Sequence, residues 1–281
     1  MTLLNGKEVS KVILEEIKRK LENEQIRPGL AVIQVGEDEA SNIYIKRKAK
    51  MAEELGYNFR HIKLPENVSE EKLLRTIDDI NADDTIDGLL VQMPVPRHIN
   101  PKTVQNRISP LKDVDGLTDI NMGRLAHNEE SLVPCTPMGV IDLLNYYDIE
   151  ISGKNVTIVG RSDLVGKPLA NLMANNDATV TLCHSKTQNL KFHTENADIL
   201  VVAVGKAKLI KADHVKEGAV VVDVGINRME DKKLCGDVDF DSVKDKASFI
   251  TPVPGGVGPM TVAELAKNTY KAYKRLRKTL K

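Results

Sequence analysis

Tyr44 and Lys48 are the first residues whose types and spacing could do chemistry. They stand four apart in a segment whose apolar pattern, from about Ala40 to Leu55, predicts a helix ended by Gly56. Both side chains therefore project from one helix face and could contact one substrate. A lysine that is desolvated enough to be neutral can act as a general base. Tyr-x-x-x-Lys also occurs in short-chain dehydrogenases, but there the glycine-rich turn precedes the pair, whereas here Gly160 follows it, so the order argues against that family. A surface lysine beside a half-buried tyrosine is the plainer alternative.

Two further polar residues are candidates for the same chemistry. Gln92 ends a buried-looking apolar strand, and the carboxyl ends of parallel strands are where open α/β sheets bind ligands. Asp115 lies in a turn-prone segment, where an Asx-turn is the alternative interpretation. With the Tyr/Lys pair, these residues could bind the edge of a polar heterocycle and provide general-base catalysis. The sequence has no Ser-His-Asp order and no His/Cys cluster, so neither serine hydrolysis nor a metal site is expected.

A glycine turn, Gly160-Arg161-Ser162-Asp163-Leu164-Val165-Gly166, lies between a predicted strand and a predicted helix. Backbone amides at such a helix start bind phosphate groups. The turn follows the first strand of an alternating unit, which is where doubly wound folds bind dinucleotides. It is not G-x-G-x-x-G, because Ser162 takes the place of the second glycine, and a plain tight turn is the alternative.

The end of the next predicted strand indicates which dinucleotide binds. NAD-binding folds usually place an Asp or Glu about 20 residues after the turn, on the ribose 2′-hydroxyl. Here the sequence is Cys183-His184-Ser185-Lys186, without a carboxylate, and Arg161 is available nearby. A cation together with hydroxyl groups suits a 2′-phosphate. We therefore predict NADP rather than NAD.

The elements that must position these groups alternate between strand and helix, which predicts parallel sheets with right-handed crossovers. We expect an α/β protein with two domains and an active-site cleft between them. The first is an N-terminal α/β domain over 1–138, completed by a C-terminal helix over 260–281. The second is a Rossmann-like, doubly wound parallel sheet over 139–259 that binds NADP. Predicted strands are 30–36, 58–64, 88–92, 156–159, 179–183, 199–204, 219–224 and 248–250, and predicted helices are 8–22, 40–55, 69–80, 138–147, 167–174 and 259–281.

Composition excludes several classes of protein. The 281 residues carry 40 Lys and Arg against 40 Asp and Glu, so the basic surface of a nucleic-acid binder is missing. Six Tyr, four Phe and no Trp are too few for base-stacking platforms. Apolar runs such as 219–222 fall far short of the roughly 20 residues that span a bilayer. With three cysteines, no C-x-x-C pair and no signal peptide, we expect a cytoplasmic protein whose Cys135, Cys183 and Cys235 are small buried apolar residues.

Six motifs in the same order make the chain resemble, nearly end to end, the bifunctional methylenetetrahydrofolate dehydrogenase/methenyltetrahydrofolate cyclohydrolase family of the FolD type. Met93 and Val95 stand where that family commonly has leucines, a volume-conserving change. The stretches that carry the resemblance are Tyr44-Ile45-Lys46-Arg47-Lys48, Gly88-Leu89-Leu90-Val91-Gln92-Met93-Pro94-Val95-Pro96, Lys112-Asp113-Val114-Asp115-Gly116, Pro134-Cys135-Thr136-Pro137, Gly160-Arg161-Ser162 and Thr251-Pro252-Val253-Pro254-Gly255-Gly256-Val257-Gly258-Pro259-Met260-Thr261.

The resemblance implies oxidation of 5,10-methylenetetrahydrofolate by NADP+ and hydrolysis of the methenyl product to 10-formyltetrahydrofolate, in one-carbon metabolism that serves purine biosynthesis. It implies that Lys48 is the essential cyclohydrolase residue, that Gln92 orients it, that Tyr44 packs on the folate and that Asp115 anchors the pterin. It further implies a homodimer joined through the nucleotide-binding domains. Further substrate contacts implied are Val91, Met93, Pro252, Val253, Pro254, Gly255 and Gly256, and the implied NADP contacts are Gly160, Arg161, Ser162, Ser185 and Ile226.

Two other hypotheses belong to different classes. The first is an NADP-dependent dehydrogenase of another small substrate, of the short-chain or amino-acid type, which would not respond to competition by folate analogues. The second is a non-catalytic nucleotide sensor, which would bind NADP+ although Lys48 and Asp115 could be replaced without chemical effect. The order and number of the motifs favour the bifunctional enzyme.

Overall fold

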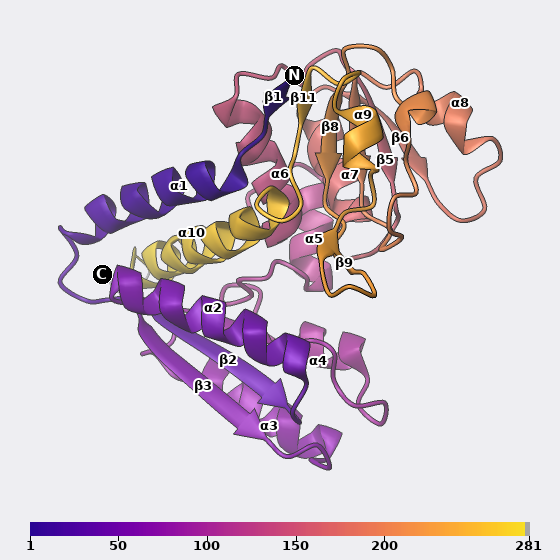
Figure 1. Ribbon diagram of the computed structural model, residues 1–281. Helices are drawn as coiled ribbons and strands as arrows, with labels where there is room; N and C mark the ends of the chain where they lie inside the picture. Colours follow the sequence, from indigo (N-terminus) through magenta and orange to yellow (C-terminus); the bar gives the residue numbers. More distant parts are fainter. Residues whose placement is uncertain (279–281) are drawn as a thin grey trace. The chain divides into compact units, whose positions relative to one another are not determined.

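The computed structural model describes residues 1–278 of the chain (Figure 1). The backbone divides into two compact units. The first unit contains Met1–Lys11 and Thr136–Thr261, and the second contains Val12–Cys135 and the chain from Val262 onward. This differs from the expected boundaries at the N-terminus, because residues 1–11 belong to the unit that holds the glycine turn. The reason is that β1 (Thr2–Leu3) pairs in parallel with β11 (Phe249–Ile250).

The first unit is built on a six-stranded sheet in the order β1-β11-β8-β7-β5-β6, in which every neighbouring pair is parallel. Apart from β1, the chain starts this sheet at β5, adds β6 on one side and then β7 and β8 on the other, as in a doubly wound fold. The switch in direction therefore lies between β5 and β7. The bounds are β5 (Asn155–Val159), β6 (Thr179–Cys183), β7 (Ile199–Val202) and β8 (Val220–Asp223), with α6 (Cys135–Tyr146), α7 (Gly166–Asn175), α8 (Leu190–Thr194), η1 (Ala212–His214) and α9 (Phe240–Val243).

The second unit has a three-stranded parallel sheet in the order β3-β2-β4. All residues of the central strand β2 are buried, and its side chains alternate between two apolar clusters. Leu30 and Val32 pack with residues of α2, whereas Ala31 and Ile33 pack with residues of α3. Helices therefore cover both faces of this sheet. The bounds are β2 (Gly29–Val35), α2 (Glu39–Leu55), β3 (Asn58–Leu64), α3 (Glu70–Asn81), β4 (Gly88–Val91), α4 (Pro101–Arg107) and α5 (Asp119–Ala126).

The helix that carries Tyr44 and Lys48 is capped at both ends. The Asp38 carboxylate accepts a hydrogen bond from the N–H of Ser41 at 2.7 Å, which satisfies one of the amides that a helix start leaves free. Gly56 ends the helix in the left-handed conformation, with φ at 69°, which confirms the predicted stop. These two caps set where α2 begins and ends, and hence which face presents the Tyr/Lys pair.

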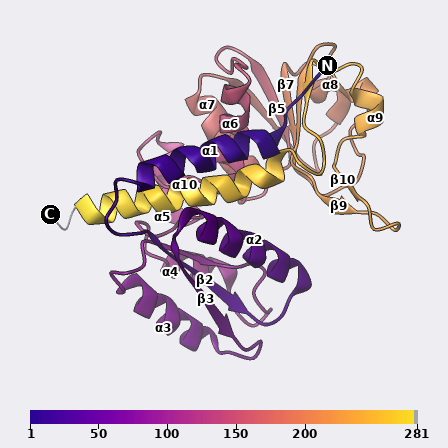
Figure 2. The ribbon, with the colours of Figure 1, turned by 60° about the vertical axis from the view of Figure 1, so that its left-hand side comes forward.

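Two long helices each contribute residues to both units. They are α1 (Gly6–Leu21) and α10 (Val257–Lys278), and residues 279–281 of the predicted final helix lie outside the described residues. Within the second unit, Ile17 and Leu21 of α1 join Leu265 and Ala266 of α10 in one apolar cluster, and the two helices lie side by side (Figure 2). The C-terminal helix therefore completes the core of the second unit. Within residues 1–278, no helix combines the length and the apolar character that crossing a membrane requires.

The structure contains short elements that apolar periodicity does not predict. Helices α4 and α5 lie between residues 101 and 126, where no helix is predicted. In addition, β9 (Asn227–Arg228) pairs with β10 (Leu234–Cys235) as an antiparallel hairpin. Helix α6 begins at Cys135, two residues before the proline at which a start was expected. Proline is tolerated in the first helical turn because its missing N–H has no partner there.

Candidate functional site

Lys48 and Gln92, which are 44 residues apart in the sequence, are in direct contact in the second unit. The Lys48 Nζ donates a hydrogen bond to the Gln92 Oε1 at 3.0 Å. The other end of the amide is held as well, because the Gln92 Nε2 donates to the carbonyl oxygen of Met93 at 2.9 Å. Its backbone N–H continues the sheet by donating to the carbonyl of Ile33 at 2.8 Å. The Gln92 amide is therefore held at both ends, with its oxygen hydrogen-bonded to the Lys48 amine at the carboxyl end of β4.

Asp115 is brought to this pair because its segment runs beside β4. The N–H of Leu89 donates to the carbonyl of Lys112 at 2.7 Å, and Leu89 forms a parallel bridge with Asp113. Burial raises the pKa of the Asp115 carboxyl above its usual value, and the charge of Lys48 opposes that rise. The structure thus places a partly desolvated acid within electrostatic reach of the lysine.

Asp113 has a different task from Asp115, although only one residue separates them. Its carboxylate accepts hydrogen bonds from the N–H groups of Leu117 and Thr118 at 3.2 and 2.9 Å, and from the Asn121 Nδ2 at 2.9 Å. Asp113 therefore holds the turn that follows, whereas Asp115 interacts electrostatically with Lys48.

Cys135 is buried, as expected, and contacts the segment that holds Asp113 and Asp115. Its thiol donates to the carbonyl of Val114 at 3.3 Å, and the Asn268 Nδ2 donates to that same oxygen at 2.9 Å. Burial raises the pKa of the Cys135 thiol well above its usual value, and the nearby Asp115 carboxylate adds to the rise. The thiol therefore stays protonated and acts as a donor. Asn268 was not a candidate from the sequence, because nothing in its neighbourhood indicates a contact 154 residues away.

The remaining predicted substrate contacts of this unit differ in exposure. Tyr44 is 41% exposed one helical turn before Lys48, and the guanidinium of Arg47 lies 5.8 Å from its ring centre. Val91 is only 5% exposed, and its side chain packs in the core below β4. Met93 is partly buried against the same core, and the Ser41 Oγ donates to its carbonyl at 3.4 Å. Of the three, Tyr44 is the one that offers an open surface to a ligand.

In the first unit, two residues of the glycine turn are glycine for steric reasons. Gly160 follows β5 with φ at 124°, and a Cβ there would lie 2.1 Å from the carbonyl oxygen of Ala203. A Cβ on Gly166 would lie 1.9 Å from the carbonyl oxygen of Gly160. The turn is therefore folded tightly between the end of β7 and the start of α7. This is the carboxyl edge of the sheet at the switch between β5 and β7, where doubly wound folds bind a dinucleotide.

The end of β6 lies next to this turn, since the N–H of Gly160 donates to the carbonyl of Cys183 at 2.9 Å. Arg161, Ser162 and Ser185 are exposed here. The loop after Cys183 is tied by the N–H of His184, which donates to the Thr187 Oγ1 at 2.8 Å. Residues 183–187 contain no carboxylate, so nothing at this strand end repels a phosphate. A dinucleotide with a 2′-phosphate fits this set of cationic and hydroxyl groups.

The loop Pro252–Gly256 and Ile226 complete the predicted contacts of the first unit. The loop lies against the start of α1, where the N–H of Lys7 donates to the carbonyl of Gly255 at 3.1 Å. A Cβ on Gly6 would lie 1.8 Å from the carbonyl oxygen of Gly256, so the two segments touch through backbone alone. Ile226 follows β8 and is 47% exposed, so its side chain is accessible to a ligand.

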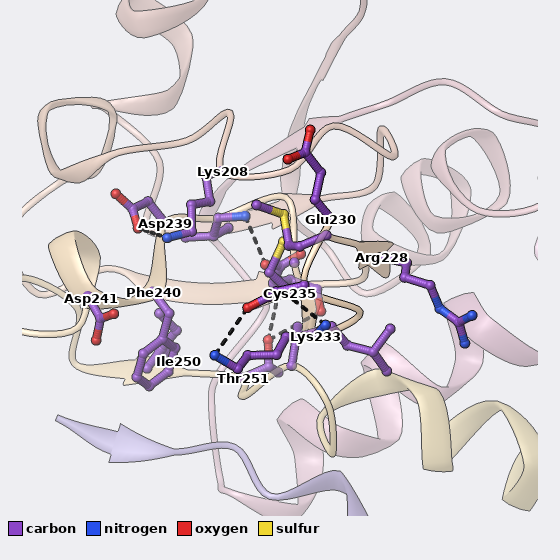
Figure 3. A pocket seen from close by; sticks show the side chains of 17 residues that line it. Lys208, Arg228, Glu230, Lys233, Cys235, Asp239, Phe240, Asp241, Ile250 and Thr251 are labelled. Atoms are coloured by element: carbon purple, nitrogen blue, oxygen red, sulfur yellow. Dashed lines mark hydrogen bonds and ion pairs between the residues drawn. The ribbon is translucent and has the colours of Figure 1, made fainter.

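A separate cavity of about 830 Å³ opens beside the hairpin β9–β10 of the first unit. Figure 3 shows Lys208 and Asp239 directed toward one another in its wall, where the Lys208 Nζ is 3.5 Å from the Asp239 Oδ1. Asp223, Cys235 and Thr251 also line it. Of the predicted site residues only Val253 does so, and the glycine turn does not. This cavity is therefore distinct from the predicted phosphate-binding edge.

Comparison with known proteins gives a consistent result over both units. A family model of the tetrahydrofolate dehydrogenase/cyclohydrolase catalytic domain matches residues 4–115, and a model of the NAD(P)-binding domain of the same family matches residues 134–277. The Bifunctional protein FolD of Bacillus subtilis (strain 168) is 51% identical over 277 residues, which is 98% of each chain.

Solved structures agree with these matches. A bifunctional FolD enzyme, a methylenetetrahydrofolate dehydrogenase/cyclohydrolase from Campylobacter jejuni, superposes with a TM-score of 0.96 at 48% identity, covering 98% of this chain and 99% of that one. The Trypanosoma brucei enzyme, solved in complex with NADP cofactor and inhibitor, superposes with a TM-score of 0.93 at 37% identity and covers 98% of each chain.

Proposed function

Because the chain belongs to the tetrahydrofolate dehydrogenase/cyclohydrolase family, we propose that it performs both reactions of that name with NADP as cofactor. It oxidises 5,10-methylenetetrahydrofolate to the 5,10-methenyl form and hydrolyses that product to 10-formyltetrahydrofolate. The observation that carries the proposal is the Lys48–Gln92 hydrogen bond beside the Asp115 carboxyl, inside a chain that matches both domain models over nearly its full length.

In the oxidation, NADP+ held at the glycine turn would supply the acceptor for a hydride from the methylene carbon. The chain contributes binding and orientation rather than a reacting group. Backbone N–H groups at the Gly160 turn and the start of α7 suit the phosphates, and Arg161 suits the 2′-phosphate. Pro252–Gly256 has little side chain and would let the folate and nicotinamide approach closely.

In the hydrolysis, water adds to the methenyl carbon and loses one proton, and the bond from that carbon to N5 then breaks as the remaining hydroxyl proton passes to N5, which leaves the formyl group on N10. We assign the proton transfer to Lys48, because its amine is the basic group held at this position by Gln92 and can exchange a proton with the attacking water. Gln92 holds the amine through its Oε1, so the nitrogen has a defined position when water attacks. Asp115 would bind N–H groups of the pterin, and Tyr44 would pack on the ring system with its exposed face.

The proposal extends to the setting in which the enzyme acts. We propose that it is a cytoplasmic homodimer joined through the first unit, and that its 10-formyl product serves purine biosynthesis. Neutral net charge and the lack of a basic surface in the sequence support a small-molecule substrate rather than a nucleic acid. Gel filtration with light scattering would test the dimer, because a single species at the mass of one chain would contradict it.

A spectrophotometric assay tests the activity directly. The purified protein is mixed with 5,10-methylenetetrahydrofolate and either NADP+ or NAD+, and reduced nicotinamide is followed with time. We expect turnover with NADP+ and less with NAD+. The hydrolysis is measured separately by supplying the methenyl compound without nucleotide. Absence of both reactions would overturn the proposal, and oxidation of an unrelated alcohol instead would favour a dehydrogenase of another small substrate.

A further inference from the structure

Asp237 is a buried carboxylate of the first unit that the proposed mechanism leaves without a task. The residue is 0% exposed and lies just after β10. Its Oδ2 accepts hydrogen bonds from the N–H groups of Val204 and Gly205, at 2.6 and 2.9 Å. Its Oδ1 accepts one from the Asn227 Nδ2 at 2.8 Å. One side chain therefore ties together two backbone segments that are more than 20 residues apart in the sequence.

Both segments belong to the edge of the sheet where the dinucleotide is expected. Val204 and Gly205 follow β7, and Asn227 follows β8 directly after the exposed Ile226. The Gly160 turn packs on the same β7 exit, because a Cβ at Gly160 would meet the carbonyl of Ala203 at 2.1 Å. Doubly wound folds bind the two halves of a dinucleotide on either side of this switch point. The loops that Asp237 holds thus border the half that lies over β7 and β8.

Asp237 is itself held by a second buried carboxylate. Asp223, the last residue of β8, accepts hydrogen bonds from the N–H groups of Asp237 and Val238 at 3.0 and 2.8 Å, and from Gly225 at 2.9 Å. Two glycines make room for this arrangement. A Cβ on Gly225 would lie 2.2 Å from the Asp237 Cγ, and a Cβ on Gly236 would lie 1.8 Å from the Asp223 Oδ2. The two carboxylates are therefore closely packed against the backbone at Gly225 and Gly236.

We propose that Asp237 is a positioning residue for NADP: it sets the shape of the β7 and β8 exit loops that receive the dinucleotide, without itself touching the ligand. Its full burial and its exclusive use of both oxygens on protein donors support the indirect role. The inference rests on the proposed function for the identity of the ligand. It predicts that the residue acts on nucleotide binding and leaves the folate-hydrolysing residues of the second unit unaffected.

The main test compares Asp237→Ala and Asp237→Asn with the wild type, with the exposed Asp245→Ala as the control in the same unit. Calorimetry with NADP+ gives the dissociation constant. We expect it to rise about tenfold or more in Asp237→Ala, because three hydrogen bonds to a charged acceptor are lost. In Asp237→Asn the amide oxygen can still accept from Val204 and Gly205, and Asn227 can turn its own amide to pair with the new NH₂ group, so we expect a rise of about threefold or less.

Two further readouts separate positioning from general damage. Hydrogen exchange in the free protein should accelerate at the amides of Val204 and Gly205 in Asp237→Ala and much less in Asp237→Asn. Hydrolysis of the methenyl substrate without nucleotide should stay within about twofold of the wild type. Unchanged NADP+ affinity in Asp237→Ala, or equal loss of nucleotide binding and of hydrolysis, would overturn the proposal.

Two controls keep the test decisive. If Asp237→Ala does not fold, Asn227→Ala removes only the Oδ1 partner, and we expect faster exchange at Ile226 and about threefold weaker binding of NADP+. Unchanged exchange and affinity in both Asn227→Ala and Asp237→Asn would then overturn the proposal. A wild type that binds NADP+ but turns over no folate would refute the proposed function alone, since the binding and exchange results do not depend on it.

Discussion

The polar cluster around Lys48 and the loops around Gly160 are built in opposite ways. The first uses polar and charged side chains: Lys48 is hydrogen-bonded to Gln92, and its charge acts on the Asp115 carboxyl. The second uses backbone groups around glycines, with its ionisable side chains either exposed, as Arg161 is, or buried behind the loops, as Asp237 is. Both depend on a buried aspartate that binds loop amides: Asp113 in one and Asp237 in the other. The comparison indicates that hydrolysis depends on single side chains, whereas nucleotide binding depends on the shape of the loops.

Loss of Lys48 should affect hydrolysis more strongly than any other change considered below affects its own activity. Lys48→Met should lower the rate of methenyl hydrolysis by about 10²- to 10⁴-fold, because it removes the general base. Oxidation should keep much of its rate, since hydride transfer depends on positioning. The two activities are measured separately, with the exposed Lys46→Met on the same helix as the control. Equal loss of both activities would contradict the role assigned to Lys48.

Asp115→Asn should weaken the binding of folate rather than the binding of the nucleotide. Loss of one or two charge-assisted hydrogen bonds to the pterin would raise the KM for the folate substrate about 10- to 100-fold. The KM for NADP+ should change little, because the turn that suits it belongs to the other unit. Steady-state kinetics in both substrates checks this, with the exposed Asp79→Asn as the control. A change confined to the KM for NADP+ would reverse the assignment of the two regions.

Asp223 should make the stability of the first unit depend on pH, because its carboxyl is buried behind the nucleotide loops. Burial raises its pKa from 3.8 to about 6, with the Asp237 charge adding to the rise. The folded protein therefore holds this proton more tightly than the unfolded chain, so stability falls as the pH rises through this range. Between pH 4.5 and 7.5 the cost of ionisation grows by about 2 kcal/mol.

Asp223→Asn cannot ionise and should lack this contribution. Urea unfolding at several pH values measures it as the difference in free energy of unfolding between wild type and variant. We expect the advantage of the wild type to shrink by about 2 kcal/mol from pH 4.5 to pH 7.5. A difference that is constant with pH would show that the carboxyl keeps an ordinary pKa in the folded state.

The smallest expected effect is on the choice of cofactor. Arg161→Ala should reduce the preference for NADP+ over NAD+ by about fivefold, because an exposed guanidinium gains only modest energy from a phosphate in water. The ratio of kcat/KM for the two nucleotides measures it, and the exposed Arg75→Ala in the second unit is the control. An unchanged ratio would assign recognition of the 2′-phosphate to other groups at the end of β6.

Much of the architecture follows from the sequence, because apolar runs and capping residues are local signals. The strands of both parallel sheets except β1, and the stop at Gly56, could be predicted in this way, and the resemblance to a family supplied the roles of Lys48, Gln92 and Asp115. The roles themselves stay predictions, although the contact between Lys48 and Gln92 is now established.

Features that depend on long-range contacts could not be predicted. Asn268 reaches the carbonyl of Val114 across 154 residues, and Asp237 reaches Val204 across 33. No periodicity or motif signals such partners, because each depends on how the elements pack. The pairing of β1 with β11 was missed for the same reason, since a two-residue strand with both residues exposed has no apolar pattern.

That pairing has a consequence for the order in which the chain can fold. Thr2 and Leu3 are synthesised more than 240 residues before their partners Phe249 and Ile250. The first unit therefore cannot complete its sheet until β11 has been made, and the backbone groups along one side of β11 stay uncovered until β1 pairs with it. A bulky domain fused directly before β1 would hinder this late pairing of β1 with β11.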